Sequence, residues 1–381
     1  MSGENFEIKQ ISDKREMEDF IDVPYRLYKD DPHWVPPLRM MVRDVLNIKK
    51  HPFYRHAHLY ALVAYRNGEP IARIAGIIDQ NHIKHHQEKV GFFGFFECPD
   101  DPKLAEALFD RVRTWLKEKG MEAMRGPMNP SINNECGLLV DGFDRDPSLM
   151  MPHNFPYYER LLEAEGLKKI KELYAFDIHC ENRFAEIMVK RAEQLKKKAE
   201  VNFRTINMKR LYEEVFLIVD IYNDAWSKNW GFVPMEKAEI KQLADELKDI
   251  ADPRMIFFAE VNGVAAGFGL GLPDANIAFK KIKNGKLFPF GIFKLLWYLK
   301  GPGKKAINRI RIPILGVRQA YQPLGLGALL FTEYLSRAPK AGYPTGEASW
   351  ILEDNQSMMR AAEKMQGKKT KTYRIYEQSL Q

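Results

Sequence analysis

The sequence has few cysteines, and their spacing matches no metal centre. Cys98, Cys136 and Cys180 are the three cysteines among 381 residues, and an odd number of scattered thiols does not build a disulfide framework. We therefore expect a reducing compartment, the cytoplasm. His82, His85 and His86 lack carboxylates at ligand spacing, so we predict surface histidines and no metal site.

Long apolar runs are also missing. The longest candidate, Leu287–Leu299, is shorter than the roughly 20 residues that span a bilayer, and it contains Lys294. The first ten residues, MSGENFEIKQ, are polar and do not predict a signal peptide. With 45% apolar and 29% charged residues, the composition predicts a folded protein, and the length favours two domains.

The net charge of +7 favours anionic partners, namely phosphorylated cofactors, nucleic acid or an acidic membrane face. A nucleic-acid binder needs a basic stripe with exposed aromatic residues. The lysines cluster instead in 181–200, in 277–308 and in the C-terminal tail. We therefore predict no nucleic-acid partner.

The sequence repeats itself. Residues 62–81 match residues 257–276, and both segments predict a β-hairpin with a tight Asn-Gly turn. Strands and helices then follow in one order, with predicted strands at 90–98, 121–128 and 170–178 and helices at 102–119 and 157–165 in the first copy. In the second copy the strands are at 309–317, 347–352 and 370–378, and the helices at 326–337 and 355–366. Gly166 and Gly367 are the predicted helix stops.

This order predicts two copies of one α/β unit, each a mixed sheet flanked by helices. We predict an N-terminal domain over 1–180, a helical connection over 181–200 and a C-terminal domain over 201–381. Two unrelated α/β domains with one matching hairpin remain the alternative.

The segment 322–328, QPLGLGA, lies between a predicted strand and a predicted helix. A helix N-terminus offers unpaired N–H donors, and glycines let an anion approach the backbone. The pattern Gln322-x-x-Gly325-x-Gly327 resembles the pyrophosphate loop of the GNAT superfamily of acyl-CoA-dependent N-acyltransferases. The resemblance implies a twisted, mostly antiparallel sheet in each unit and an acyl-CoA donor. It implies these cofactor-binding residues: Gly316, Val317, Gln322, Leu324, Gly325, Leu326, Gly327, Ala328 and Asn355.

Two departures from the family pattern stand out. The closing helix usually has a tyrosine that protonates the leaving thiolate, and Ala362 occupies that position. The first copy has Glu97, Asp100, Asp101 and two prolines where the pyrophosphate loop belongs, and these would repel phosphate. We therefore expect the first copy to be degenerate and only the second to bind coenzyme A.

Amide formation needs a base for the amine proton and a donor for the carbonyl oxygen. By the resemblance, the donor is a backbone N–H near Gly316 and Val317. Glu347 and Glu353 flank the strand 347–352 and are the candidate catalytic carboxylates. For Asp354 we favour an N-cap of the next helix, which leaves Glu347 as the better base.

Two further segments are candidate acceptor sites. The turn-rich segment 126–144 includes Asn129, Asn133, Asn134 and Glu135, which form either an acceptor-binding loop or a simple connection. The insertion 277–308 mixes lysines with apolar residues, among them Phe290 and Trp297. It is suited to an anionic membrane surface, to a tunnel for an acyl chain, or to a packed excursion over the sheet.

The two-unit layout, with VGFFGFFE, GPMNPSINNECGLLVDGF and SWILEDN, is similar to the bacterial ceramide synthase group. That similarity implies N-acylation of a lipid-like long-chain base, with peripheral contact at the inner membrane face. A small-molecule N-acetyltransferase and a non-catalytic acyl-CoA or lipid-binding protein remain the alternatives.

Overall fold

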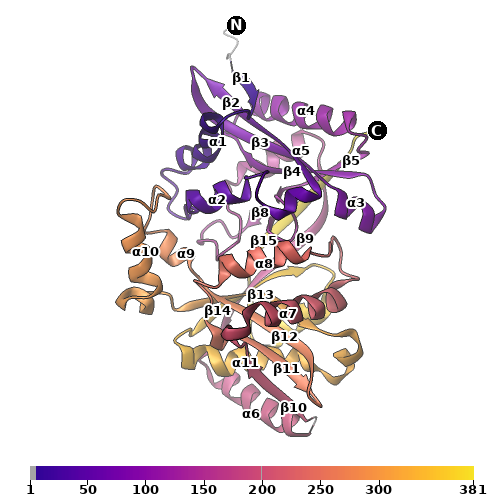
Figure 1. The fold of residues 1–381 in the computed structure, drawn as a ribbon, viewed down its shortest axis with the longest axis vertical. Coiled ribbons are helices and arrows are strands. Elements are labelled where there is room, and N and C mark those ends of the chain that lie inside the picture. Colours follow the sequence, from indigo (N-terminus) through magenta and orange to yellow (C-terminus); the bar gives the residue numbers. More distant parts are fainter. Residues whose placement is uncertain (1–5, 199) are drawn as a thin grey trace. The chain divides into compact units, whose positions relative to one another are not determined.

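The computed structural model describes residues 6–198 and 200–381, which form two compact units (Figure 1). Unit 1 comprises Met1–Glu172, Ile282–Gly291 and Thr372–Gln381, and unit 2 comprises Leu173–Lys281 and Ile292–Lys371. Residues 1–5, part of the segment for which no signal peptide is predicted, lie outside the described residues. So does residue 199 of the predicted connection.

Unit 1 is a sheet flanked by helices. Its strands run in the order β1 (Glu7–Gln10), β2 (Ala57–Arg66), β3 (Glu69–Asp79), β4 (Val90–Glu97) and β5 (Ala123–Gly126), with β4 and β5 parallel. Short strands β6 (Met128–Asn129), β7 (Glu135–Cys136) and β8 (Leu138–Asp141) follow. The helices are α1 (Lys14–Leu27), α2 (Arg39–Val45), α3 (Gln80–His86), α4 (Pro102–Glu118) and α5 (Tyr157–Ala164). The apolar faces of α4 and α5 lie in one buried core with β2–β5.

Unit 2 repeats the plan. Its sheet contains β10 (Val201–Thr205), β11 (Ile256–Val261), β12 (Val264–Pro273), β13 (Arg309–Val317) and β14 (Thr345–Leu352), with β13 and β14 parallel. Its helices are α6 (Arg183–Lys198), α7 (Leu211–Trp226), α8 (Lys237–Leu247), α9 (Asn276–Phe279), α10 (Gly291–Leu299), α11 (Leu326–Ala341) and α12 (Gln356–Lys364). The predicted α/β fold class with two tandem units is confirmed.

The two predicted Asn-Gly hairpins are also confirmed. Asn67 and Gly68 have φ values of 52° and 79°, and Asn262 and Gly263 have 51° and 77°. Positive φ at both central residues is the type I′ geometry, which fits the right-handed twist of the flanking strands.

The last strand of each copy does not stay within its own copy. Strand β9 (Lys168–His179) begins in unit 1 and continues into unit 2, where Tyr174 pairs with Ile351 of β14. Strand β15 (Lys368–Ser379) passes the other way, and Tyr376 pairs with Gly126 of β5. The units therefore differ from the contiguous domains predicted over 1–180 and 201–381. Strand pairing is not local, so sequence order does not say which sheet a terminal strand joins.

One of the two predicted glycine helix stops is correct. Gly166 ends α5 with φ +79°, but after α12 the left-handed residue is Gln366, with φ 58°, and not Gly367. A glycine is needed at position 367 for lack of space, because a Cβ there would lie 2.8 Å from the carbonyl oxygen of Ala362.

The predicted surface position is wrong for His82. This side chain is buried, and its Nε2 lies 2.8 Å from Glu88 Oε1. Burial lowers the pKa of His82 to about 4, against the opposing effect of Glu88. Over the described ranges, no group of three side chains is arranged to hold a metal, and no helix is long and apolar enough to cross a membrane.

Candidate active site

The glycine-rich segment forms the start of α11. Strand β13 ends at Val317, a 3₁₀ turn covers Gln319–Leu324, and Gly325 takes a left-handed φ of +70° immediately before the helix. The N–H of Gly325 donates to the carbonyl oxygen of Gln322, which closes the turn. Gly325 thus serves as the N-cap of α11, a role that its freedom to adopt positive φ permits.

The backbone at this helix start is open. A Cβ placed on Gly325 or Gly327 would meet no atom within 4 Å. The N–H of Ala328 donates to Gly325, whereas those of Leu326 and Gly327 donate to no acceptor among the residues that the structure describes. The first turn of α11 contains no acidic side chain. Open backbone donors at a helix N-terminus fit an anionic group such as a diphosphate.

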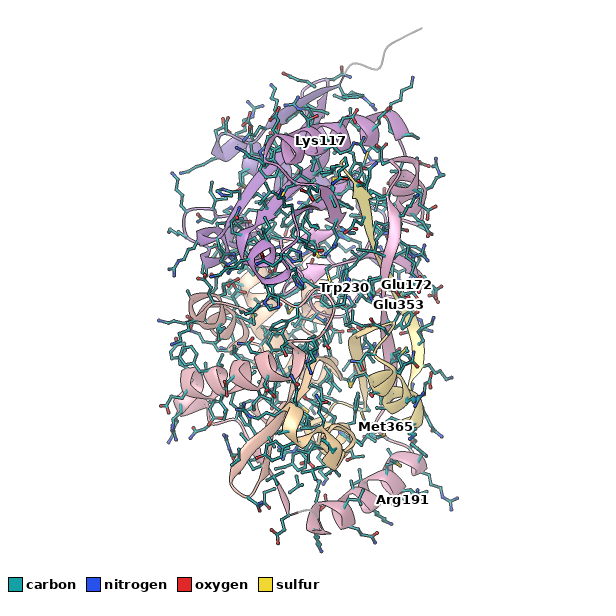
Figure 2. All side chains as sticks on the ribbon, turned by 90° about the vertical axis from the view of Figure 1, so that its right-hand side faces the viewer. Lys117, Glu172, Arg191, Trp230, Glu353 and Met365 are labelled. Carbon is teal, nitrogen blue, oxygen red and sulfur yellow. The ribbon has the colours of Figure 1, made fainter. Side chains whose placement is uncertain are left out.

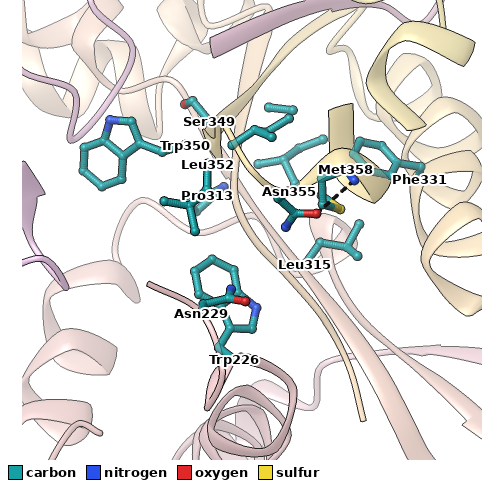
Figure 3. Close-up of a pocket in the computed structure, with 13 residues that line it drawn as sticks. Trp226, Asn229, Pro313, Leu315, Phe331, Ser349, Trp350, Leu352, Asn355 and Met358 are labelled. Atoms are coloured by element: carbon teal, nitrogen blue, oxygen red, sulfur yellow. Dashed lines mark hydrogen bonds between the residues drawn. The ribbon is translucent and has the colours of Figure 1, made fainter. Parts of the chain in front are cut away.

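A pocket opens where β13 and β14 separate, and α11 contributes Phe331 to its lining. The two strands pair only from Arg309 to Ile312 and from Thr345 to Ala348. Past that point the pairing of β14 with β9 shifts register between Ala348 and Ile351. The pocket is lined by Trp226, Asn229, Ile312, Pro313, Leu315, Phe331, Ala348, Ser349, Trp350, Ile351, Leu352, Asn355 and Met358. Trp226 and Asn229, from the end of α7 and the residues after it, face Asn355 and Met358 across the opening (Figure 3).

The end of β13 also presents a backbone donor to the side that β14 has left. The N–H of Arg318 donates to Ala266 of β12. Since successive N–H groups of a strand point in opposite directions, the N–H of Val317 points away from β12, and that of Gly316 points toward it. Of the two predicted donors, Val317 has the orientation that the pocket requires.

Asn355 lies at the pocket and also caps α12. Its Oδ1 accepts from the N–H of Met358 at 3.1 Å, the bond dashed in Figure 3. The prediction that Asp354 is the N-cap is therefore wrong by one residue. Ala362 is fully buried in α12, so this helix supplies no hydroxyl at the position of the family tyrosine. None of the side chains that line the pocket is an acid or base.

Glu347 lies behind the pocket in a buried network. Its side chain is 1% exposed, its Oε2 lies 3.2 Å from Arg309 Nη2, and its Oε1 accepts from Ser349 Oγ at 2.8 Å. Arg311 Nε donates to the same Ser349 Oγ at 3.1 Å. Arg309 also pairs with Asp177. Burial opposes the charge of Arg309, but the two carboxylates outweigh it and raise its pKa above the usual value.

This geometry changes the prediction for Glu347. The carboxylate does not line the pocket, whereas Ser349 does. Ser349 is two residues along the same strand, so both side chains are on one face. Ser349 was not predicted, although its spacing from Glu347 in EASWIL was a usable signal. Trp226 and Asn229 were not predicted either, and for them the sequence offered no signal.

Glu353 follows the carboxyl end of β14 and is half-buried (Figure 2). It is absent from the pocket lining, so the structure does not bring it together with Ser349 and Asn355.

In unit 1 the chain itself lies close against β4. A Cβ on Gly94 of β4 would lie 1.6 Å from the carbonyl oxygen of Met128. Asn129 Oδ1 accepts from the N–H of Phe95 at 2.6 Å. At the start of α4, the side chain of Asp101 already accepts from the N–H of Leu104. A carboxylate thus occupies the position that a diphosphate would need.

The other predicted acceptor residues are placed as follows. Asn129 and Glu135 pair across the β6–β7 hairpin, and Asn134 Oδ1 accepts from Ser131 Oγ at 2.8 Å. The N–H of Asn133 donates to Ser131. Phe290 and Trp297 are exposed and do not line the pocket of unit 2.

Known proteins resemble this chain over its whole length, although no family model matches it. It is 39% identical over 370 residues to a Caulobacter vibrioides (strain NA1000 / CB15N) protein named bacterial ceramide synthase, covering 96% of this chain and 95% of that protein. It is 37% identical over 379 residues to Protein YghO of Escherichia coli (strain K12), covering 98% and 95%.

Among solved structures, a tandem GNAT protein from the clavulanic acid biosynthesis pathway aligns with a TM-score of 0.57 at 12% identity, over 99% of both chains. This likeness shows the fold. The chain therefore belongs to the family of tandem GNAT-fold N-acyltransferases that contains the bacterial ceramide synthase.

Proposed function

We propose that the protein transfers an acyl group from acyl-CoA to the amine of a lipid-like long-chain base. The observation that supports this most directly is the open N-terminus of α11 at Gly325 and Gly327, on a helix whose Phe331 lines the pocket between β13 and β14. The acceptor class is suggested by the Caulobacter relative, which is named bacterial ceramide synthase. A lipid acceptor is drawn from a bilayer, so the proposal includes peripheral contact at the cytoplasmic face of a membrane.

The donor would bind through its diphosphate. The N–H groups of Leu326 and Gly327 would donate to it, and the absence of a Cβ at Gly325 would let it approach. Gln322 and Leu324 shape the turn before the helix. The acyl-bearing arm would then run between β13 and β14, past Asn355, with the N–H of Val317 facing the thioester side.

Ser349 would relay the amine proton to Glu347. As the amine nitrogen bonds to the thioester carbon and the C–S bond breaks, one N–H proton passes to Ser349 Oγ. The hydroxyl proton of Ser349 passes to Glu347 Oε1, along the hydrogen bond of 2.8 Å. Arg311 orients the Ser349 hydroxyl, and Arg309 offsets the negative charge of Glu347 before the transfer.

The leaving thiolate would depart without a side-chain acid. Ala362 offers no proton, and the pocket lining contains no titratable group. A thiol pKa of about 8.5 makes the thiolate a fair leaving group, so solvent can protonate it after release. Glu353 remains a proposed accessory carboxylate, and Asn133, Asn134 and Glu135 remain predictions as acceptor contacts.

The direct test is a product assay on the purified full chain with sphinganine and acyl-CoA of several chain lengths, read by mass spectrometry. We expect an N-acyl sphinganine. If the only product is an acetylated soluble amine, the lipid acceptor is wrong and the small-molecule alternative stands. Binding of acyl-CoA without any product would support the non-catalytic alternative.

A further inference from the structure

Helix α10 presents apolar side chains on two opposite faces. Leu295, Tyr298 and Leu299 are partly buried against the core of unit 2. On the other face, Phe293, Leu296 and Trp297 are 68%, 45% and 54% exposed. Spacings of three and four residues place these three side chains side by side along the helix. We call Phe293, Leu296 and Trp297 the outer face of α10.

The chain directly before the helix also exposes large apolar side chains. Phe288 and Phe290 are each 74% exposed. Large aromatic side chains in water are unfavourable, and contiguous exposed apolar patches mark interaction sites. Helix α10 spans nine residues, so five large exposed apolar side chains fall within its length and the three residues before it.

The charge of this segment has one sign. Between Asp274 and Glu333 the sequence contains no aspartate or glutamate. The lysines of the insertion are Lys280, Lys281, Lys283, Lys286, Lys294, Lys300, Lys304 and Lys305. Lys300 lies 3.3 Å from Asp249, but that pair is exposed on both sides and is therefore weak. The segment thus combines exposed aromatic residues with side-chain charge of positive sign alone.

We propose that the outer face of α10 docks on an anionic lipid bilayer. Aromatic and leucine side chains enter the boundary between headgroups and acyl chains, while lysines contact anionic headgroups. A second protein copy would bring its own positive charge to the same surface, which disfavours that occupant. The inference deepens the proposed function, since it names the surface through which a lipid acceptor is reached, but its test needs no substrate.

The test is sedimentation of the full-length protein with phosphatidylcholine vesicles, with and without 30% phosphatidylglycerol. We expect binding to the anionic vesicles, at least tenfold weaker binding to the neutral ones, and loss of binding in 0.5 M salt. The double variant F293S/L296S should weaken binding at least tenfold. The matched control is Y212S/F216S, which removes two exposed aromatic residues from α7 of the same unit and should bind as the unaltered chain does.

Two results would overturn the inference. One is equal vesicle binding by F293S/L296S and Y212S/F216S, with melting temperatures showing that both are folded. The other is a dimer that F293S/L296S dissociates while no vesicle binding occurs, which would assign the face to a second copy. Turnover of a detergent-free, short-chain amine acceptor separates the two proposals, since failure of docking alone would leave that turnover intact.

Discussion

Exchanging Gly325 for glutamate should weaken coenzyme A binding at least a hundredfold while leaving the fold in place. The backbone at Gly325 has a φ of +70°, and the space above it is open. A side chain there costs roughly 1–2 kcal/mol for the left-handed conformation. A carboxylate at a helix N-terminus returns about 0.3–1 kcal/mol of that cost. The variant should therefore be only slightly less stable.

The effect on binding is larger. A carboxylate about 5 Å from one phosphate charge, at an effective dielectric constant of about 20, repels it by about 3 kcal/mol. That energy corresponds to an approximately two-hundredfold larger dissociation constant, and a second phosphate charge increases the repulsion further. Salt screening reduces the figure, so the measurement belongs at low ionic strength.

Gly342 provides a matched control at the other end of the same helix. It has a φ of +94°, and a Cβ there would also meet nothing within 4 Å. Helix α11 has 16 residues, which places Gly342 about 24 Å from Gly325. Gly342→Glu bears the same backbone cost, and the helix dipole disfavours a carboxylate there. We expect Gly342→Glu to lower the melting temperature more and to leave coenzyme A affinity unchanged.

The assay is isothermal titration of each variant with coenzyme A, beside a thermal melt. We expect Gly325→Glu to have the lower coenzyme A affinity but the higher melting temperature, and Gly342→Glu to have the reverse. If Gly325→Glu and Gly342→Glu bind coenzyme A equally well, the diphosphate does not contact the start of α11.

Three further changes test other parts of the structure. Ser349→Ala should lower kcat about 100- to 10,000-fold with little change in KM for acyl-CoA, Ser349→Thr should restore turnover, and an unchanged kcat would exclude the relay. His82 binds a proton less readily when folded, so the free energy of unfolding should fall by about 3 kcal/mol from pH 7 to pH 4; urea titrations of His82→Gln should show a smaller loss, and equal losses would contradict the assignment. Gln366→Gly should raise the free energy of unfolding by roughly 0.5–1 kcal/mol, because glycine adopts φ 58° without strain, and a fall in stability would contradict this reasoning.

Local features were predictable because neighbouring residues decide them. The Asn67-Gly68 and Asn262-Gly263 turns need positive φ, and the sequence supplies the residues that adopt it. The start of α11 followed from glycines placed after an apolar strand. Near misses occurred at helix ends, where Asn355 rather than Asp354 caps α12 and Gln366 rather than Gly367 turns left-handed. There, adjacent residues compete for one backbone position, and packing selects between them.

The candidate site was predictable only in part, because it combines segments that are distant in the sequence. Glu347 was predicted as a carboxylate near a strand, but its burial, its pairing with Arg309 and its hydrogen bond with Ser349 depend on strand register. The register of β13 and β14 is set by pairing between residues over thirty positions apart. The residue pattern of neither strand predicts the position at which the two strands separate.

The sequence by itself determined the repeated order of strands and helices, the turns between them and the difference in charge between the segments that follow β4 and β13, since these depend on backbone preferences and charge within a few residues. Only the tertiary structure decided that β9 and β15 each pass from one unit to the other, and that the carbonyl oxygen of Met128 lies against Gly94 of β4 in unit 1. Strand pairing and side-chain volume act between residues brought together by folding, and a linear pattern does not contain those neighbours.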